Sequence, residues 1–121
     1  MLVTVENAYP KSHRLLTPRD FRHVFQRARK RSAGGLALYA RANDLGHPRL
    51  GMAISRKCSP RAVTRNRIKR AIREVFRKRK KALGGLDLVF LGQPGIGDKT
   101  AAELRATVEY LLNQVESCGR S

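Results

Sequence analysis

The strongest pattern in the chain is an apolar stripe within residues 56–81. Its side chains recur at the i, i+4, i+7 and i+8 spacing of one helical face: Ile68, Ile72, Val75 and Phe76. Because such a stripe must pack on a core, the segment predicts a helix that lies against the rest of the protein. Ser59 and Pro60 suit its N-cap and first turn. Gly84 or Gly85 can supply the left-handed residue that ends it.

Two other segments have helical spacing. Residues 17–29 begin with Thr17 and Pro18, which suit a capped first turn. They place four apolar side chains on one face: Phe21, Val24, Phe25 and Ala28. Residues 99–117 do the same with another set: Leu104, Val108, Leu111 and Val115. Both segments predict amphipathic helices, and we expect the second to cover a sheet.

The remaining apolar segments predict strands. Residues 36–40 and 49–54 flank a turn at 43–48, so we expect them to form an antiparallel hairpin. Residues 29–35 are a basic turn or a short edge strand. Residues 86–91 are apolar enough for a central strand.

The order of these elements predicts an α+β fold. We expect a single four-stranded, mainly antiparallel sheet with three helices packed on it, in the order α-β-β-β-α-β-α. A chain of 121 residues with 41% hydrophobic residues has the size of one domain with one modest core. Its ends, about residues 1–12 and 117–121, are expected to be flexible.

Charge gives the central helix a second face. The chain has 26 Lys and Arg residues against nine Asp and Glu, and its formal net charge of +17 indicates a polyanionic partner. Residues 56–81 hold 13 of those bases and one acid, Glu74. A solvated face is the plain alternative, but such faces more often mix Glu with Lys, and Arg suits phosphate. We therefore predict that the face opposite the apolar stripe binds nucleic acid.

The residues that catalysis would need are scattered. The histidines His13, His23 and His47 have no Cys or carboxylate at zinc-like spacing near them. Carboxylates that could form an acid–base pair fall on four different elements: Asp20, Asp44, Glu74 and Asp87. The sequence thus predicts neither an active site nor a metal site in the protein alone.

The sequence also indicates a compartment. It has no apolar run of membrane-spanning length and no secretory signal at its start, so we expect a cytoplasmic protein without a membrane partner. Cys58 and Cys118 are then expected to be reduced. Cys58 lies beside Arg56 and Lys57, but a small filler is the commoner role for such a residue than a reactive thiol.

One long motif resembles a known family. Residues 62–77, Ala-Val-Thr-Arg-Asn-Arg-Ile-Lys-Arg-Ala-Ile-Arg-Glu-Val-Phe-Arg, are similar to the Arg-Asn-Arg signature of the bacterial ribonuclease P protein subunit. The resemblance extends back through residues 49–57 and covers, more loosely, about Leu15 to Val115. It implies a subunit of the ribonucleoprotein endonuclease that removes the 5′ leader of precursor tRNA.

The resemblance also implies how the work is divided. Cleavage would belong to a catalytic RNA that holds Mg²⁺, and the partners would be this RNA and precursor tRNA, not DNA. The family fold is ribosomal-protein-S5-domain-2-like. Its crossover from strand through basic helix to strand is left-handed, whereas about 98% of such crossovers are right-handed.

Two RNA-binding surfaces follow from the resemblance. The basic helix would dock on the catalytic RNA through six residues: Arg65, Asn66, Arg67, Lys69, Arg70 and Arg73. A cleft between the sheet and the first helix would hold the 5′ leader through six others: Phe21, Phe25, Tyr39, Arg56, Lys57 and Arg61. Judged without the resemblance, the two Phe residues are more typical of a core, and Tyr39 suits core and surface equally. Aromatic rings beside cations are typical of single-strand binding.

Two positions depart from the family pattern. Gln93 stands where many members have a basic residue after the last strand, and Ser55 stands where some have Lys. We expect the cleft to hold its leader with less charge there. The alternative to this assignment is a non-enzymatic RNA-binding protein, such as a ribosomal protein or an RNA chaperone. A DNA-binding module would need a helix-turn-helix pair that this order of elements lacks.

Overall fold

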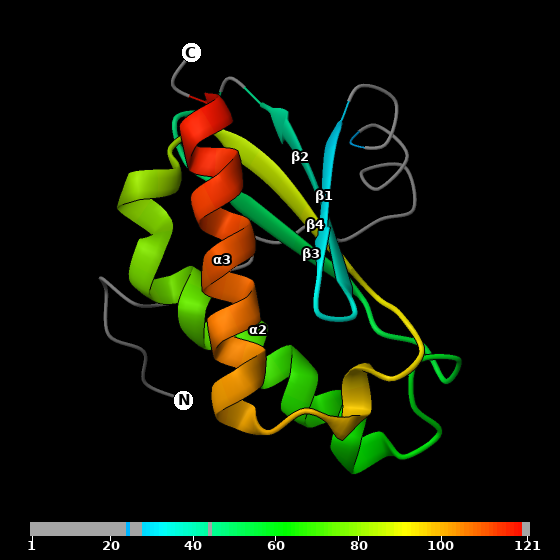
Figure 1. Ribbon diagram of the computed structural model, residues 1–121. Helices are drawn as coiled ribbons and strands as arrows, with labels where there is room; N and C mark the ends of the chain where they lie inside the picture. Colours follow the sequence, from blue (N-terminus) through cyan, green and yellow to red (C-terminus); the bar gives the residue numbers. More distant parts are fainter. Residues whose placement is uncertain (1–23, 25–27, 44, 120–121) are drawn as a thin grey trace, which may run out of the picture.

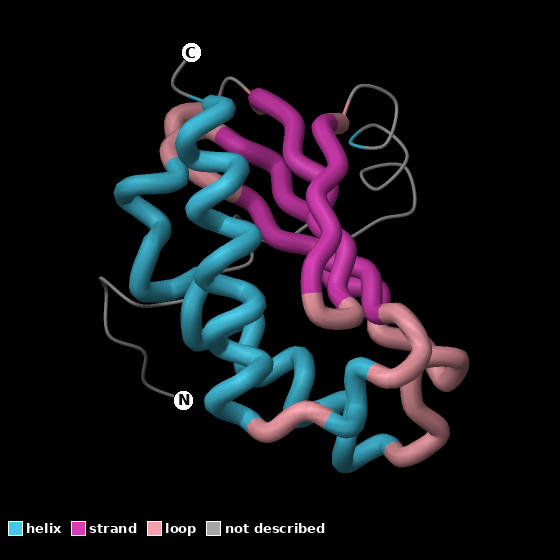
Figure 2. Tube along the Cα trace, in the orientation of Figure 1, coloured by secondary structure: helices cyan, strands magenta, loops and turns pink. Residues whose placement is uncertain are grey.

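The computed structural model describes residues 24, 28–43 and 45–119. Two α-helices, α2 (Ala62–Leu83) and α3 (Ala101–Gly119), lie together on one face of a twisted sheet (Figure 1). The sheet has four strands: β1 (Arg29–Ala33), β2 (Leu36–Ala42), β3 (Arg49–Ala53) and β4 (Leu86–Gly92). A short 3-10 helix, η2 (Ile96–Asp98), stands between β4 and α3 (Figure 2). The fold is α+β, as predicted.

The strands lie in the order β1-β2-β4-β3. β1 with β2 and β2 with β4 are antiparallel, whereas β3 and β4 are parallel. The predicted hairpin between residues 36–40 and 49–54 is therefore wrong, because β4 lies between those strands. β4 is one of the two inner strands, as its apolar sequence predicted: Leu88, Val89 and Phe90 are all fully buried, so both faces of this strand are covered.

β2 instead forms its hairpin with β1. The turn is made by Gly34 and Gly35, whose φ angles of 55° and 90° are the left-handed values that a tight two-residue hairpin turn requires. Residues 29–33 are thus an edge strand, one of the two predicted possibilities. Arg29, the predicted end of the first helix, opens this strand.

The main core lies between the sheet and the two helices. The predicted stripe of α2 is buried throughout, together with Ala71, and so is the predicted stripe of α3. The sequence pattern did not single out Leu112, which is also fully buried. These side chains pack against alternate residues of the strands: Leu36, Leu38, Leu50, Leu88 and Phe90. Since burying one such side chain contributes about 1.5–3 kcal/mol, this layer is the main apolar contribution to stability.

A smaller apolar cluster covers the opposite face of the sheet. Val24 and Val89 are both fully buried there, and Ala28, Tyr39 and Leu91 pack against them. Val24, a residue of the predicted first helix, is helical. The rest of that prediction, Phe21 and Phe25 included, lies outside the described residues.

The ends of α2 agree only partly with the sequence pattern. Arg61, not Ser59, is the residue that precedes the helix, and its backbone is extended. Ser59 is buried, and its N–H donates to the carbonyl of Ser55 at 3.4 Å, so it belongs to the preceding turn. Gly84, one of the two predicted residues, ends the helix with a positive φ of 59°, but its ψ of −142° is not that of a left-handed helical residue. No helix in the described part of the chain is long and apolar enough to cross a membrane.

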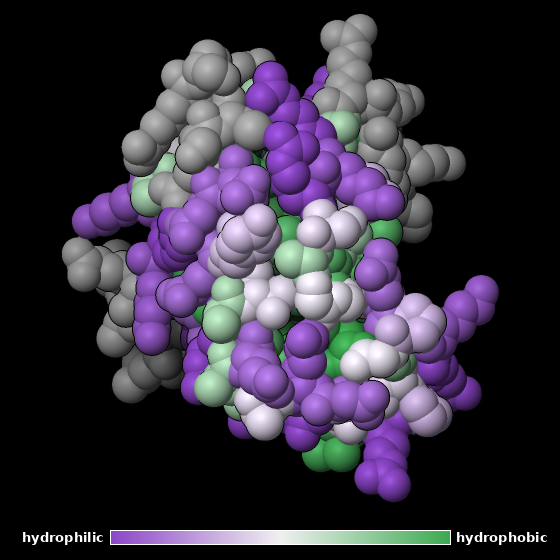
Figure 3. Space-filling model, viewed as in Figure 1, coloured by the Kyte–Doolittle hydropathy of each residue, from purple (hydrophilic) through white to green (hydrophobic). Residues whose placement is uncertain are grey.

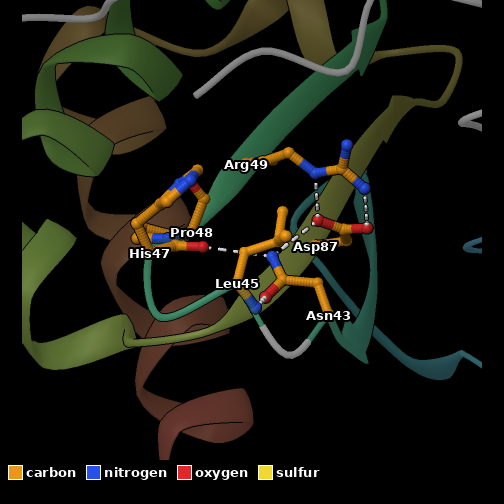
Figure 4. A network of polar contacts seen from close by, with 6 residues as sticks. All are labelled: Asn43, Leu45, His47, Pro48, Arg49 and Asp87. Atoms are coloured by element: carbon orange, nitrogen blue, oxygen red, sulfur yellow. Dashed lines mark hydrogen bonds and ion pairs between the residues drawn. The ribbon is translucent and has the colours of Figure 1, made fainter. Parts of the chain in front are cut away.

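A buried polar network fixes the turn before β3 (Figure 4). The carboxylate of Asp87, which is 1% exposed, accepts two hydrogen bonds from Arg49: Nε to Oδ1 at 2.8 Å and Nη2 to Oδ2 at 2.7 Å. Asn43 Nδ2 donates to the same Oδ1 at 2.8 Å and to the His47 carbonyl at 3.1 Å. The Leu45 N–H donates to Asn43 Oδ1 at 2.9 Å. Asp87 is therefore held as a structural acceptor.

Candidate RNA interface

All six residues predicted to meet the catalytic RNA lie on α2 and outside its buried stripe. Asn66, Arg67 and Arg70 are exposed, and the other three are half-buried: Arg65, Lys69 and Arg73. Glu74, the one acid of the basic segment, forms an ion pair with Arg105 of α3 at 3.9 Å. The acid is thus drawn toward α3, and the exposed positions of α2 keep their positive charge.

Like charges along α2 affect one another. Partial burial lowers the pKa of Lys80, and the guanidinium of Arg77, one turn earlier, lowers this pKa further. Each like-charged pair at this spacing costs a few tenths of a kcal/mol in an isolated helix, about 0.2–0.5. Bound phosphates would relieve this repulsion.

Two arginines of the Arg-Asn-Arg motif contact the protein's own backbone. Arg65 Nη1 donates to the Ser59 carbonyl at 3.0 Å, and Arg67 Nη2 donates to the Gly97 carbonyl at 2.8 Å. The other four predicted contacts differ. Within the described part of the chain their side chains make no hydrogen bond or ion pair: Asn66, Lys69, Arg70 and Arg73. Their donors face solvent and suit an external anion.

The predicted leader residues fall into two groups. Arg56, Lys57 and Arg61 are exposed on the segment between β3 and α2, directly before the basic helix. Tyr39 is half-buried on β2, on the sheet face opposite α2 and α3, where it packs against the Val24–Val89 cluster. Phe21 and Phe25 lie outside the residues that the structure describes.

Lys30 is a candidate residue that the sequence pattern did not single out. It pairs with Tyr39 across β1 and β2, and its Nζ lies 5.7 Å from the centre of the Tyr39 ring. A cation over an aromatic face is an attractive contact. The signal was present in the sequence, because a two-residue turn at Gly34–Gly35 sets Lys30 opposite Tyr39.

The two departures from the family pattern both lie in exposed connections. Gln93 is exposed after β4, and its N–H donates to the Gly35 carbonyl at 2.8 Å. Ser55 is exposed after β3, and its Oγ accepts the Lys57 N–H at 3.2 Å. That the cleft holds its leader with less charge at these positions stays a prediction.

The residue types of metal or thiol chemistry do not gather in the described residues. There, no group of three His, Cys, Asp or Glu side chains could hold a metal ion. Cys58 is a buried free thiol whose Sγ donates to the Ser55 carbonyl at 2.9 Å, which fits the predicted role of a small side chain that fills space.

The face seen in Figure 3 is mostly hydrophilic. Large apolar side chains exposed in the described part are separate residues: Leu45, Val63 and Tyr110.

Comparisons with known proteins confirm the family resemblance. The chain matches the family described as Ribonuclease P over residues 9–116. It is 45% identical to the ribonuclease P protein component of Methylococcus capsulatus over 114 residues, which are 93% of this chain and 89% of that one. The RNase P protein of Staphylococcus aureus has a similar structure, with a TM-score of 0.80 and 28% identity over 87% of this chain and 96% of that one. The RNase P protein of Thermotoga maritima also has a similar structure, with a TM-score of 0.72 and 27% identity over 84% of this chain and 96% of that one. The chain belongs to the ribonuclease P protein family.

Proposed function

We propose that this protein, a subunit of ribonuclease P in tRNA processing, docks on the catalytic RNA of that enzyme through the outer face of α2. The observation that carries the proposal is the basic segment 56–81, whose single acid is paired toward α3. Four side chains along this face have no partner within the described residues: Asn66, Lys69, Arg70 and Arg73. Cations that replace the counterions of phosphates supply most of the affinity in such contacts.

A second surface is proposed for the 5′ leader of precursor tRNA. Its supports are the half-exposed ring of Tyr39 on the sheet face opposite α2, with Lys30 beside it, and the exposed cations of the segment before α2. These cations are Arg56, Lys57 and Arg61. An aromatic ring can stack on an unpaired base of any kind, so we expect little dependence on leader sequence. Phe21 and Phe25 stay in this proposal through the family resemblance alone.

We assign hydrolysis of the phosphodiester bond to the RNA partner, with Mg²⁺ held by that RNA. The protein then contributes charge neutralisation and a binding site for the leader. We place it in the cytoplasm, with the catalytic RNA and precursor tRNA as partners. The first helix, predicted from residue 17 and ending before Ala28, stays a prediction, as do the ribosomal-protein-S5-domain-2-like arrangement and the left-handed crossover of β3-α2-β4.

Reconstitution tests this assignment. Purified protein freed of nucleic acid and supplied with Mg²⁺ should leave precursor tRNA intact, whereas protein combined with the catalytic RNA should release the 5′ leader. Cleavage by the protein alone that survives nuclease treatment of the preparation would show an active site in the protein. Sequencing the RNA that co-purifies with the protein tests the alternative, because a ribosomal protein would carry ribosomal RNA.

A further inference from the structure

Three segments meet at the start of α2. η2 lies beside the first turns of α2 in Figure 1, and its first residue, Ile96, is fully buried in the core. A Cβ on Gly97 would lie 2.9 Å from Thr64 Cγ2 and 3.4 Å from Ser59 Cβ, so the backbone of this segment is seated directly on α2 and on the turn before it. The absence of a side chain at Gly97 permits this close approach.

A second close approach connects the same segments. A Cβ on Gly92 would lie 2.8 Å from Cys58 Sγ, so the end of β4 touches the turn that follows β3. That turn, residues 55–61, also carries the exposed cations Arg56, Lys57 and Arg61. The position of these cations therefore depends on how the turn is held.

Arg65 and Arg67 hold the two connections from opposite sides. The Arg65 guanidinium reaches back to the Ser59 carbonyl inside the 55–61 turn, and the Arg67 guanidinium reaches forward to the Gly97 carbonyl in η2. These bonds span six and 30 positions in the sequence. A planar guanidinium can make such a bond and still present further N–H donors to phosphate.

We propose that Arg65 and Arg67 are positioning residues that hold the 55–61 turn and η2 against the start of α2. This role rests on the proposed function in one respect, because what they position for RNA is the cation set of that turn. A preformed turn does not have to be ordered when RNA binds, which raises affinity without a new contact. Docking of α2 on the catalytic RNA and capture of the leader are then coupled at this junction, whereas Tyr39 lies outside it.

Amide hydrogen exchange in the free protein tests the anchoring itself. Arg65→Gln should speed exchange in residues 55–61, and Arg67→Gln should speed it in residues 93–99, each about three- to tenfold for the loss of one hydrogen bond. Lys78→Gln is the matched control, since it removes the same charge from an exposed position of the same helix, roughly 17–20 Å further along it than the two arginines. Lys78→Gln should leave amide exchange in residues 55–61 and 93–99 unchanged. If neither arginine variant changes exchange in its segment, the anchoring is refuted whatever the RNA measurements give.

Leader binding tests the consequence for RNA. In holoenzyme assembled at saturating catalytic RNA, Arg65→Gln should reduce the preference for precursor tRNA over leaderless tRNA about two- to tenfold, and Lys78→Gln should leave it unchanged. Lys57→Gln should cost less in the Arg65→Gln background than in the native protein, because a displaced turn already misplaces Lys57. Additive effects would overturn the positioning role. If Arg65→Gln fails to fold, Arg65→Lys replaces it, and it should keep part of the preference because its ammonium keeps the charge and N–H donors on a long side chain.

The two failures can be told apart. Absence of any leader preference in the native holoenzyme would count against the proposed leader surface and, with it, against the RNA part of this inference. The exchange result would still decide whether the arginines anchor the two connections. Faster exchange with an unchanged leader preference would leave them as structural residues only and reject their role in positioning cations for RNA.

Discussion

At the scale of single residues, Asp87 shows what a sequence pattern leaves open. A carboxylate inside an apolar strand was visible in the sequence, but its partners were not, because Arg49 and Asn43 stand 38 and 44 positions away. Their meeting depends on β3 pairing with β4, which the periodicity of neither strand specifies. Once paired, the carboxylate accepts two bonds from Arg49, a geometry that a guanidinium suits well.

The first prediction concerns this network. Asp87→Ala removes the two oxygens that bind Arg49 and the acceptor of Asn43, and losing one partner of a largely buried pair costs about 3 kcal/mol. The free energy of unfolding in urea should fall by about that amount. Asp98→Ala removes an acid from an exposed site and should change it by less than about 0.5 kcal/mol. Equal, small effects of both substitutions would show that the network contributes little.

At the scale of elements, the helices were predictable and the strand pairing was not. Apolar spacing placed the buried faces of α2 and α3 correctly, because a helical period is a local property of the sequence. The position of β4 between β2 and β3 depends on contacts across the whole 22-residue helix α2, which no local pattern encodes. The start of α3 was missed by two residues, although Thr100 and Glu103 had the spacing of a capping box.

The second prediction concerns this cap. The Thr100 N–H donates to Glu103 Oε1 at 2.8 Å, and the Glu103 N–H donates to Thr100 Oγ1 at 3.1 Å. The hydrogen bond from the Thr100 backbone, and then that of its hydroxyl, lower the pKa of Glu103. Because the folded-state pKa lies below the unfolded one, the ionised cap stabilises the fold at neutral pH, and this contribution is lost as pH falls through the lowered pKa. We expect the free energy of unfolding in urea to decrease less between neutral and acid pH for Glu103→Gln than for the native protein.

Glu109→Gln is the control for that measurement. It removes an exposed acid from the same helix outside the cap. The free energy of unfolding of this variant should therefore decrease on acidification by as much as that of the native protein. An equal decrease in unfolding free energy on acidification in all three proteins would mean that the cap does not depend on the charge of Glu103. Thr100→Ala should separately cost about 1 kcal/mol at neutral pH, as the loss of an N-cap hydroxyl does.

At the scale of the whole molecule, charge is divided between two regions. Residues 56–81 carry 13 bases and one acid, whereas residues 82–121 carry three bases and five acids. This division, and with it the α2 surface, could be predicted from the sequence because helical geometry fixes which residues share a face. The leader surface came from the family resemblance, and the contact of Arg67 with the Gly97 carbonyl needed the folded chain.

The third prediction is a steep dependence of RNA affinity on salt. If about six phosphates are contacted, the logarithm of the affinity should fall with the logarithm of salt concentration with a slope of about −4, at ~0.7 per phosphate on single strands. Fluorescence anisotropy with labelled RNA between low and moderate salt measures this slope. Arg70→Ala should reduce the magnitude of this slope by nearly the ~0.7 that one phosphate contributes. A slope near zero would contradict an electrostatic interface.

The central claim is that α2 binds the catalytic RNA while the opposite face of the sheet binds the leader. Comparing precursor tRNA with leaderless tRNA in reconstituted holoenzyme tests it most directly. Arg70→Ala with Arg73→Ala should weaken assembly with the catalytic RNA for either substrate. Tyr39→Ala should leave assembly intact and weaken binding of precursor tRNA alone, by about 1–3 kcal/mol for one stacked base.

Tyr39→Phe is the control for that comparison, because it keeps the ring and should keep the preference for precursor tRNA. Since Tyr39 packs against the Val24–Val89 cluster, the melting temperature of each variant must be measured beside its affinity. The account predicts that, in folded proteins, the two sets of variants lose different functions. Loss of the same function to the same extent by the Tyr39→Ala and the Arg70→Ala, Arg73→Ala proteins would contradict it.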